Sequence, residues 1–220
     1  MENQRIRAIT DAAARLFLRQ GYSKTQIGHI AKVVGVSVGT IYHDFVGKQE
    51  ILHLVLKSTL DPDILDHEFQ RPIDDSLFPG LEEELMAAFG ETARAFASRL
   101  DDEDYHFDGL LSDAFDLLSR YAVGCLFLER NEVDFPALAA RYRACRSRFF
   151  QTMEQYVDRF LRRGELRPLD HPELSTVFII ETLTWWAMDL PYLSFEPRDI
   201  PPGLAKEVCV NDLLAAYRRG

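Results

Sequence analysis

The stretch from Thr25 to Lys48, TQIGHIAKVVGVSVGTIYHDFVGK, constrains the fold of this chain more than any other part of it. Apolar residues recur in its first half at i, i+3, i+4 and i+7, which predicts a short helix that Thr25 opens as the N-cap. Gly35 can take the left-handed conformation that ends a helix, and Ser37 can cap a second one. The sequence therefore predicts two short helices joined by a tight turn. The apolar face of the first helix consists of Ile27, Ile30, Ala31 and Val34.

The second predicted helix has a buried side and an outward side. Ile41 and Phe45 share one face, and Val36 should be a buried plug in the turn before the helix. Gly39 lies inside the helix, where glycine costs roughly 1 kcal/mol relative to alanine, so something should require the missing side chain. Close approach to a phosphate backbone is one such reason. The residues left for the outward faces are Val38, Thr40, Tyr42 and His43.

This arrangement suits the major groove of DNA. Hydroxyl groups can donate to phosphate oxygens, and a lysine at the start of the next helix adds a cation, so these groups should fix the register on the phosphates. From spacing alone, the same pattern also fits a plain corner in an all-helical protein. The residues expected to bind DNA are Thr25, Ser37, Val38, Gly39, Thr40, Tyr42, His43 and Lys48.

The motif T-x-x-x-I-A-x-x-x-G-V-S-x-G-T-I-Y-x-x-F-x-x-K-x-x-[IL], which runs from Thr25 to Ile51, resembles the DNA-binding signature of the TetR family of bacterial repressors. The resemblance covers roughly residues 5 to 56. Two positions depart from the common pattern. Asp44 stands where an aromatic residue or histidine is usual, so we expect it to face away from DNA or to pair with a base such as Lys48. Gly28 replaces a longer polar residue, which makes a base contact from the first helix doubtful.

The charge distribution supports a DNA-binding head. The chain has 220 residues and a net charge of −10, yet residues 1–60 hold eight Lys or Arg against four acids, a net of +4. The remaining chain is −14, from 17 bases and 31 acids. Such segregation suggests a basic head for DNA and an acidic body that avoids it.

The rest of the chain predicts further helices and no strands. Apolar stripes place a first helix before Gly21, a fourth helix over residues 47–60, and body helices that begin near residue 81. Residues 61–79 are rich in Asp and Pro and suggest a linker or an irregular corner. Pro172 should open a helix that is apolar on nearly every side, and Pro191 should close it. We therefore expect an all-α fold with a helix-turn-helix domain at 1–46 and a helical domain at 47–220, joined by the helix 47–60.

Composition and motifs argue against several other classes. No signal peptide and no apolar run of about 18 residues is evident, so a cytoplasmic protein without a membrane partner is expected. Three widely spaced cysteines suggest reduced core thiols. We find no catalytic motif, no cofactor loop and no metal site, because His67 and His106 lack ligand spacing despite acidic neighbours. The expectation is a protein with no enzyme activity, no cofactor and no metal.

Family resemblance implies a homodimer that binds a palindromic operator in double-stranded DNA and senses a small effector, apolar or aromatic in character. A ligand could shift the far end of helix 47–60 and so change the separation of the paired heads. The pocket is expected among Phe89, Phe96, Tyr121, Cys125, Phe149, Met153, Tyr156 and Trp185. The dimer interface is expected at Leu174, Phe178, Val210, Leu213, Leu214 and Tyr217.

The sequence favours a ligand-responsive repressor, and it leaves two alternatives open. An activator with the same head would differ only in where its operator lies. A helical enzyme or protein-interaction module with a vestigial head belongs to another class, and DNA binding would separate it from a regulator.

Overall fold

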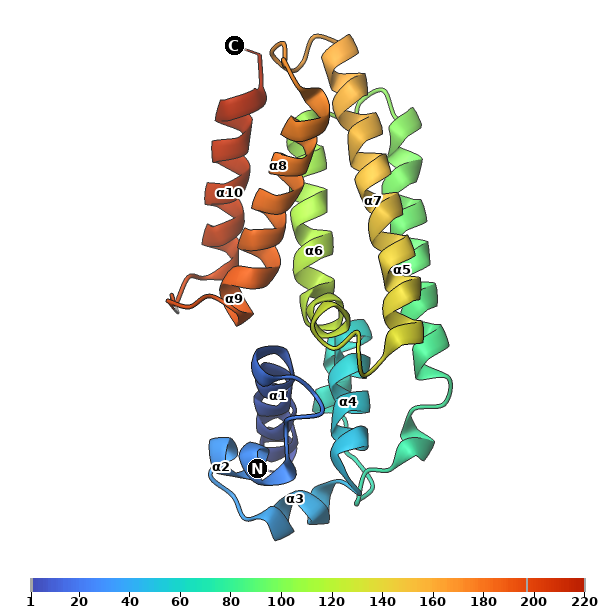
Figure 1. Ribbon diagram of the computed structural model, residues 1–220, viewed down its shortest axis with the longest axis vertical. Coiled ribbons are helices and arrows are strands. Elements are labelled where there is room, and N and C mark those ends of the chain that lie inside the picture. Colours follow the sequence, from blue (N-terminus) through green and yellow to red (C-terminus); the bar gives the residue numbers. More distant parts are fainter. Residues whose placement is uncertain (1, 197, 220) are drawn as a thin grey trace. The chain divides into compact units, whose positions relative to one another are not determined.

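The computed structural model describes residues 2–196 and 198–219, and the regular elements in these ranges are all helical (Figure 1). The all-α fold expected from the sequence is confirmed. Within the described ranges, β-type backbone pairing is limited to two isolated bridges, which join Phe45 to Ile73 and Leu166 to Arg218. The helices are α1 (Glu2–Gln20), α2 (Ile27–Val34), α3 (Val38–Asp44), α4 (Lys48–Leu60), α5 (Leu81–Ser98), α6 (Phe107–Arg130), α7 (Pro136–Arg162), α8 (Pro172–Thr184), α9 (Leu190–Tyr192) and α10 (Pro202–Tyr217), with 3₁₀ turns at Pro62–Asp66, Asp75–Leu77 and Arg99–Asp101.

The chain divides into two compact units that do not follow a single cut along the sequence. The first unit comprises residues 1–88 with 123–140, and the second comprises residues 89–122 with 141–220. The helices α5, α6 and α7 therefore each contribute residues to both units. The end of α6 and the start of α7 belong to the unit that contains the helix-turn-helix.

In the first unit, α1 packs against α2 and α4 through its apolar stripe. Ile6, Ile9 and Phe17 have no exposed surface, and Gly21 with φ +92° ends the helix where the sequence predicted. The start of α2 differs from the prediction. Thr25 is fully buried and lies before the N-cap residue Gln26, so the helix begins at Ile27.

The segment between α4 and α5 is packed against the head and does not form a solvated linker. The Ile73 N–H donates to the Asp44 carbonyl at 2.8 Å, and the Val46 N–H donates to the Ile73 carbonyl at 3.0 Å. Ile64, Leu65 and Ile73 are buried. These contacts join residues 70–74 to the end of α3, so the irregular corner predicted from composition has a defined position in the first unit.

Aromatic side chains form much of the core of the second unit. Rings from α5 meet rings from α6 and α7: Phe89 lies 5.2 Å from Tyr121, and Phe96 lies 5.5 Å from Phe149 between ring centroids. The Tyr156 hydroxyl donates to the Phe96 carbonyl, and burial raises the pKa of Tyr156 to about 12. The helices α8 and α10 lie side by side (Figure 1).

The helical path does not stop at Pro191 as the sequence predicted. After α8 it continues as a π-helical segment, Trp185–Asp189, and then as α9 to Tyr192. A proline ring collides with the carbonyl four residues earlier in an α-helix, and a wider turn relieves that collision. The Leu190 N–H accordingly bonds to the Trp185 carbonyl, five residues back.

Candidate nucleic-acid interface

Local capping builds the turn between α2 and α3. Gly35 has φ +78°, in the left-handed region, and its N–H donates to the Ala31 carbonyl at 2.9 Å. The Ser37 hydroxyl accepts from the Thr40 N–H at 3.0 Å and caps α3. The capping roles predicted for Gly35 and Ser37 are confirmed. Val36 is half-buried, so it is a partial plug of the turn.

The faces of α3 separate as the residue pattern predicts. Ile41 and Phe45 have no exposed surface and fix the helix to the head. Val38 is 44% exposed and Tyr42 is 52% exposed, with the His43 side chain also in solvent. A short helix therefore presents an apolar side chain, a phenol and an imidazole outward in the first unit.

Gly39 is not required by the protein itself. A Cβ built at Gly39 would meet only the Ser37 hydroxyl oxygen, at 3.6 Å, which is an ordinary van der Waals contact. The residue is exposed. Glycine in a helix destabilises it relative to alanine, so the missing side chain leaves room for something outside the chain.

Asp44, the residue that departs from the common pattern, faces inward. It is fully buried and accepts two hydrogen bonds from the Arg5 guanidinium, at 2.6 and 2.7 Å. Arg71 lies 3.6 Å from the same carboxylate. Burial alone would raise the pKa of Asp44, but hydrogen bonds from Arg5 and His43 and the charges of Arg5 and Arg71 hold it below its usual value. Asp44 is therefore buried in the first unit, and its partner is Arg5 instead of the predicted Lys48.

Thr25 and Lys48, both predicted to contact phosphates, make hydrogen bonds inside the first unit. The Thr25 hydroxyl donates to the Gly21 carbonyl at 2.8 Å. The Lys48 ammonium donates to the carbonyls of Tyr22 and Thr25, at 2.9 and 3.0 Å, and lies 4.1 Å from the centre of the Tyr22 ring. Burial lowers the pKa of Lys48. Both side chains therefore hold the loop between α1 and α2 in place, a role that the sequence did not predict.

That loop is also held by residues that the sequence did not single out. Asn131, at the end of α6, is 3% exposed, and its Oδ1 accepts from the Tyr22 N–H at 2.6 Å. Its Nδ2 donates to the Phe127 carbonyl at 2.9 Å. An asparagine after a helix suggests only a turn, so no local signal identifies this contact over 109 residues. Rings around it form an aromatic cluster of Phe17, Tyr22, Phe127 and Phe135.

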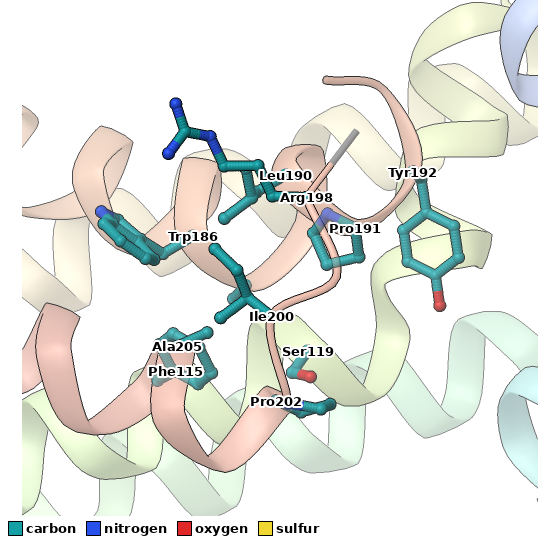
Figure 2. Close-up of a pocket in the computed structure, with 11 residues that line it drawn as sticks. Phe115, Ser119, Trp186, Leu190, Pro191, Tyr192, Arg198, Ile200, Pro202 and Ala205 are labelled. Carbon is teal, nitrogen blue, oxygen red and sulfur yellow. The ribbon is translucent and has the colours of Figure 1, made fainter. Parts of the chain in front are cut away.

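A cavity of about 120 Å³ lies in the second unit (Figure 2). It is enclosed by α6, the π-helical segment, α9 and the segment that leads into α10. Figure 2 shows Ile200 between Trp186 and Pro191. This volume is somewhat smaller than the about 150 Å³ of a protein cavity that binds benzene. The lining residues are Phe115, Ser119, Trp186, Ala187, Leu190, Pro191, Tyr192, Arg198, Ile200, Pro202 and Ala205.

None of the residues predicted for the pocket lines this cavity. Phe89, Phe96, Tyr121, Met153 and Tyr156 are buried in the aromatic core, and the half-buried Phe149 contacts Phe96. Phe96 and Tyr121 also border an open groove between α5 and α6. Cys125 belongs to the first unit, and Trp185 is 49% exposed. The apolar stripes predicted from the sequence form core packing at most of these positions.

The residues predicted for the dimer interface divide into two sets. Leu174 and Phe178 on α8 are about 60% exposed, at 62% and 59%. Leu213 and Tyr217 on α10 are buried inside their own unit, which removes them from any surface a second copy could contact. Val210 and Leu214 are half-buried.

The histidines considered for a metal have other surroundings. His106 Nδ1 lies 3.3 Å from a Glu165 carboxylate oxygen, and His67 is exposed. Over residues 2–196 and 198–219, no three His, Cys, Asp or Glu side chains are grouped so that they could hold a metal ion. In the same ranges, no helix has both the length and the apolar character that a membrane span requires.

The capped turn and the outward face of α3 define a helix-turn-helix protein. Residues 9–55 match the family model described as bacterial regulatory proteins, tetR family. This match confirms the resemblance of the motif to the DNA-binding domain of the TetR family, over residues 9–55 of the chain.

The comparisons with individual proteins agree with that assignment. The chain is 41% identical over 76 residues to the HTH-type transcriptional regulator HbdR of Aromatoleum sp. (strain CIB), which is 34% of this chain and 32% of HbdR. It is 43% identical over 58 residues to the HTH-type transcriptional regulator SrpR of Pseudomonas putida, covering 26% and 27%. The matched part of the chain thus spans only about a third or less of the length of these relatives.

Similarity over the full length comes from structure. The ketosteroid transcriptional regulator KstR2 of Mycobacterium tuberculosis superposes with a TM-score of 0.56 at 15% identity, covering 98% of this chain and 96% of that one. At this identity the likeness shows the fold alone. The matched relatives are transcriptional regulators and not enzymes.

Proposed function

We propose that this protein is a DNA-binding transcriptional regulator whose α3 enters the major groove. The observation that carries the proposal is Gly39, which nothing inside the protein requires and which lies on the face formed by Val38, Tyr42 and His43. A glycine there lets the helix backbone approach a phosphate closely. Ser37, Thr40 and Tyr42 supply hydroxyl groups around that point, while Thr25 and Lys48 support them from inside the head.

Binding to duplex DNA tests this proposal directly. Fluorescence anisotropy on duplexes from the protein's own upstream region should show tight binding that weakens steeply with salt. Val38→Ala removes an exposed side chain of α3 and should lower affinity for the preferred sequence. Val133→Ala is the matched control, because Val133 is 90% exposed in the turn between α6 and α7. Absence of salt-dependent binding, or equal loss in both variants, contradicts the proposal.

We infer that two copies bind a nearly palindromic operator. A single short recognition helix offers few contacts, and paired heads multiply them. The exposed face of α8 supports a contact between copies, since apolar side chains on it recur at helical spacing and remain in solvent. On α8 these residues are Leu174, Val177 and Phe178, and the exposed Trp185 of the π-helical segment follows them.

The oligomeric state tests this inference by sedimentation. Leu174→Glu places a charge on the exposed α8 face and should give monomers. Leu77→Glu alters a leucine that is 41% exposed in the first unit, so it should leave the dimer intact. A dimer that survives Leu174→Glu moves the interface to another surface.

We infer that a small apolar or aromatic effector controls DNA binding. The cavity in Figure 2 supports this, because its lining is largely apolar and includes Phe115 and Ser119 of α6. A ligand acts only through its difference in affinity between two states, typically about 1–3 kcal/mol. The helix α4, which begins in the head at Lys48, is the predicted route, and α6 offers a second one through Asn131.

Tryptophan fluorescence tests effector control separately from DNA binding. Trp186 lines the cavity, so a compound that enters it should change the emission and weaken operator binding over the same concentration range. Trp186→Phe should remove the signal. Compounds that bind and leave DNA affinity unchanged would contradict effector control and leave DNA binding intact. Whether occupancy represses or activates depends on the operator position, which a reporter gene with the operator moved relative to the promoter determines.

A further inference from the structure

The imidazole of His43 is in contact with the buried carboxylate next to it. His43 Nδ1 lies 3.2 Å from Asp44 Oδ1, while 66% of the His43 side chain is exposed and the Asp44 side chain has no exposed surface. The contact joins a group on the outward face of α3 to a group inside the head. The second ring nitrogen, Nε2, is on the far side of the ring from the carboxylate.

The Asp44 side chain and its backbone are held by two segments of the chain. Arg5 of α1 donates to both oxygens, Arg71 approaches from the segment before α5, and the Asp44 carbonyl accepts from the Ile73 N–H. These contacts hold the Asp44 carboxylate in one orientation. Because it is ionised, it carries no hydrogen, so the hydrogen in the contact with His43 belongs to Nδ1.

We propose that Asp44 is a positioning residue that fixes neutral His43 in the Nδ1–H tautomer, so that Nε2 meets DNA as a hydrogen-bond acceptor. In the major groove, adenine N6 and cytosine N4 are the base donors, whereas guanine presents acceptors and thymine an acceptor and a methyl group. His43 therefore selects adenine or cytosine on the strand it contacts. The opposite tautomer would carry a hydrogen on Nε2 and select guanine or a phosphate oxygen. The base preference rests on the proposed DNA binding. The tautomer of His43 is a property of the free protein and does not depend on that proposal.

The tautomer is measured on the free protein by ¹⁵N NMR of the imidazole nitrogens in mildly alkaline buffer, where an imidazole is neutral. In the wild type, His43 should show a protonated Nδ1 and an unprotonated Nε2, with the signals assigned by their loss in His43→Gln. Asp44→Asn should give a mixture of tautomers. If the Nε2–H tautomer of His43 predominates in the wild type, the proposal is overturned. This measurement is made on the wild-type protein and needs no variant of Asp44.

His53 provides an internal reference for the same spectrum. Its Nδ1 lies 2.9 Å from Asp75 Oδ1, so it is a second carboxylate-paired imidazole in the first unit. Asp75→Asn should shift the tautomer of His53, leave His43 unchanged and leave base preference unchanged. A change at His43 in this variant would contradict a local effect of Asp44.

The base preference is measured on the duplex selected by the wild-type protein. Replacing the contacted adenine or cytosine by an analogue that lacks the exocyclic amine should weaken wild-type binding roughly tenfold. The same replacement should have little effect on His43→Ala and a reduced effect on Asp44→Asn. If Asp44 is merely structural, Asp44→Asn weakens binding to both duplexes equally. If no duplex binds at all, the proposed function fails while the NMR result still decides the tautomer.

Discussion

Replacing Gly39 with alanine should make the protein more stable and a worse DNA binder. The added methyl group meets only the Ser37 hydroxyl oxygen at 3.6 Å, so the fold accommodates it. Alanine in place of a helical glycine adds about 0.5–1 kcal/mol to the free energy of unfolding. If the methyl group displaces one phosphate, the lost hydrogen bond to a charged group costs about 1.5–3 kcal/mol, or roughly 10- to 150-fold in Kd for each subunit.

The chain offers a matched control for this experiment. Gly28 is the second residue of α2, as Gly39 is of α3, and a Cβ there meets nothing within 4 Å. Gly28→Ala should therefore raise stability by a similar amount and leave DNA affinity nearly unchanged. Denaturant unfolding gives the stability of both variants, and anisotropy at fixed salt gives their affinities.

Two results would refute this reasoning. If Gly39→Ala lowers stability, then the space around Gly39 is needed by the protein. If Gly39→Ala is more stable and binds DNA as tightly as the wild type, then no phosphate approaches α3 at this point. A comparable loss of affinity in Gly28→Ala would extend the interface to α2.

Three further perturbations follow from the described contacts. Lys48→Ala removes the cation that binds two carbonyls and should lower the free energy of unfolding by about 1–3 kcal/mol, measured in urea, with a salt slope of DNA binding close to that of the wild type. The pKa of Asp44 is lowered in the folded state, so ionised Asp44 contributes fully to the free energy of unfolding above the unfolded-state pKa of about 4, and this contribution is lost as the pH falls towards the folded-state pKa. The difference in the free energy of unfolding between wild type and Asp44→Asn should therefore shrink over that pH range. A difference that stays constant with pH contradicts this prediction. Burial raises the pKa of Cys209 to about 12, so this thiol should resist maleimide in the native protein and react after unfolding, as mass spectrometry of the labelled peptide would show.

The helix-turn-helix could be predicted because its determinants are local. The left-handed conformation at Gly35 and the hydroxyl cap from Ser37 follow from the residue types and their spacing. The buried and outward faces of α3 follow from helical periodicity. The local pattern predicted the wrong N-cap for α2. Thr25 is a residue type that caps helices well, but its hydroxyl donates to the Gly21 carbonyl, and it lies one residue before the actual N-cap, Gln26.

The candidate site beyond α3 depends on contacts that sequence spacing does not encode. The partner of Asp44 is Arg5, 39 residues earlier in the chain, so the charge pairing could not be assigned from the motif. The aromatic residues of the body formed plausible stripes, but periodicity does not distinguish a ring that lines a cavity from one that fills a core. The cavity arises instead where Pro191 widens the helix, a geometric effect that replaces the predicted helix end.

The contacts of Asn131 bear on how this protein can be dissected and recombined. Because Asn131 and the aromatic cluster hold the loop at Tyr22, the head is completed by a segment more than a hundred residues later in the chain. A fragment that ends after α4 would expose Phe17 and leave the Tyr22 N–H without its acceptor. Chimeras that exchange the N-terminal domain between related regulators should therefore carry residues 123–140 with it, and directed evolution of a transplanted head should find its compensating changes at Phe127, Asn131 and Phe135.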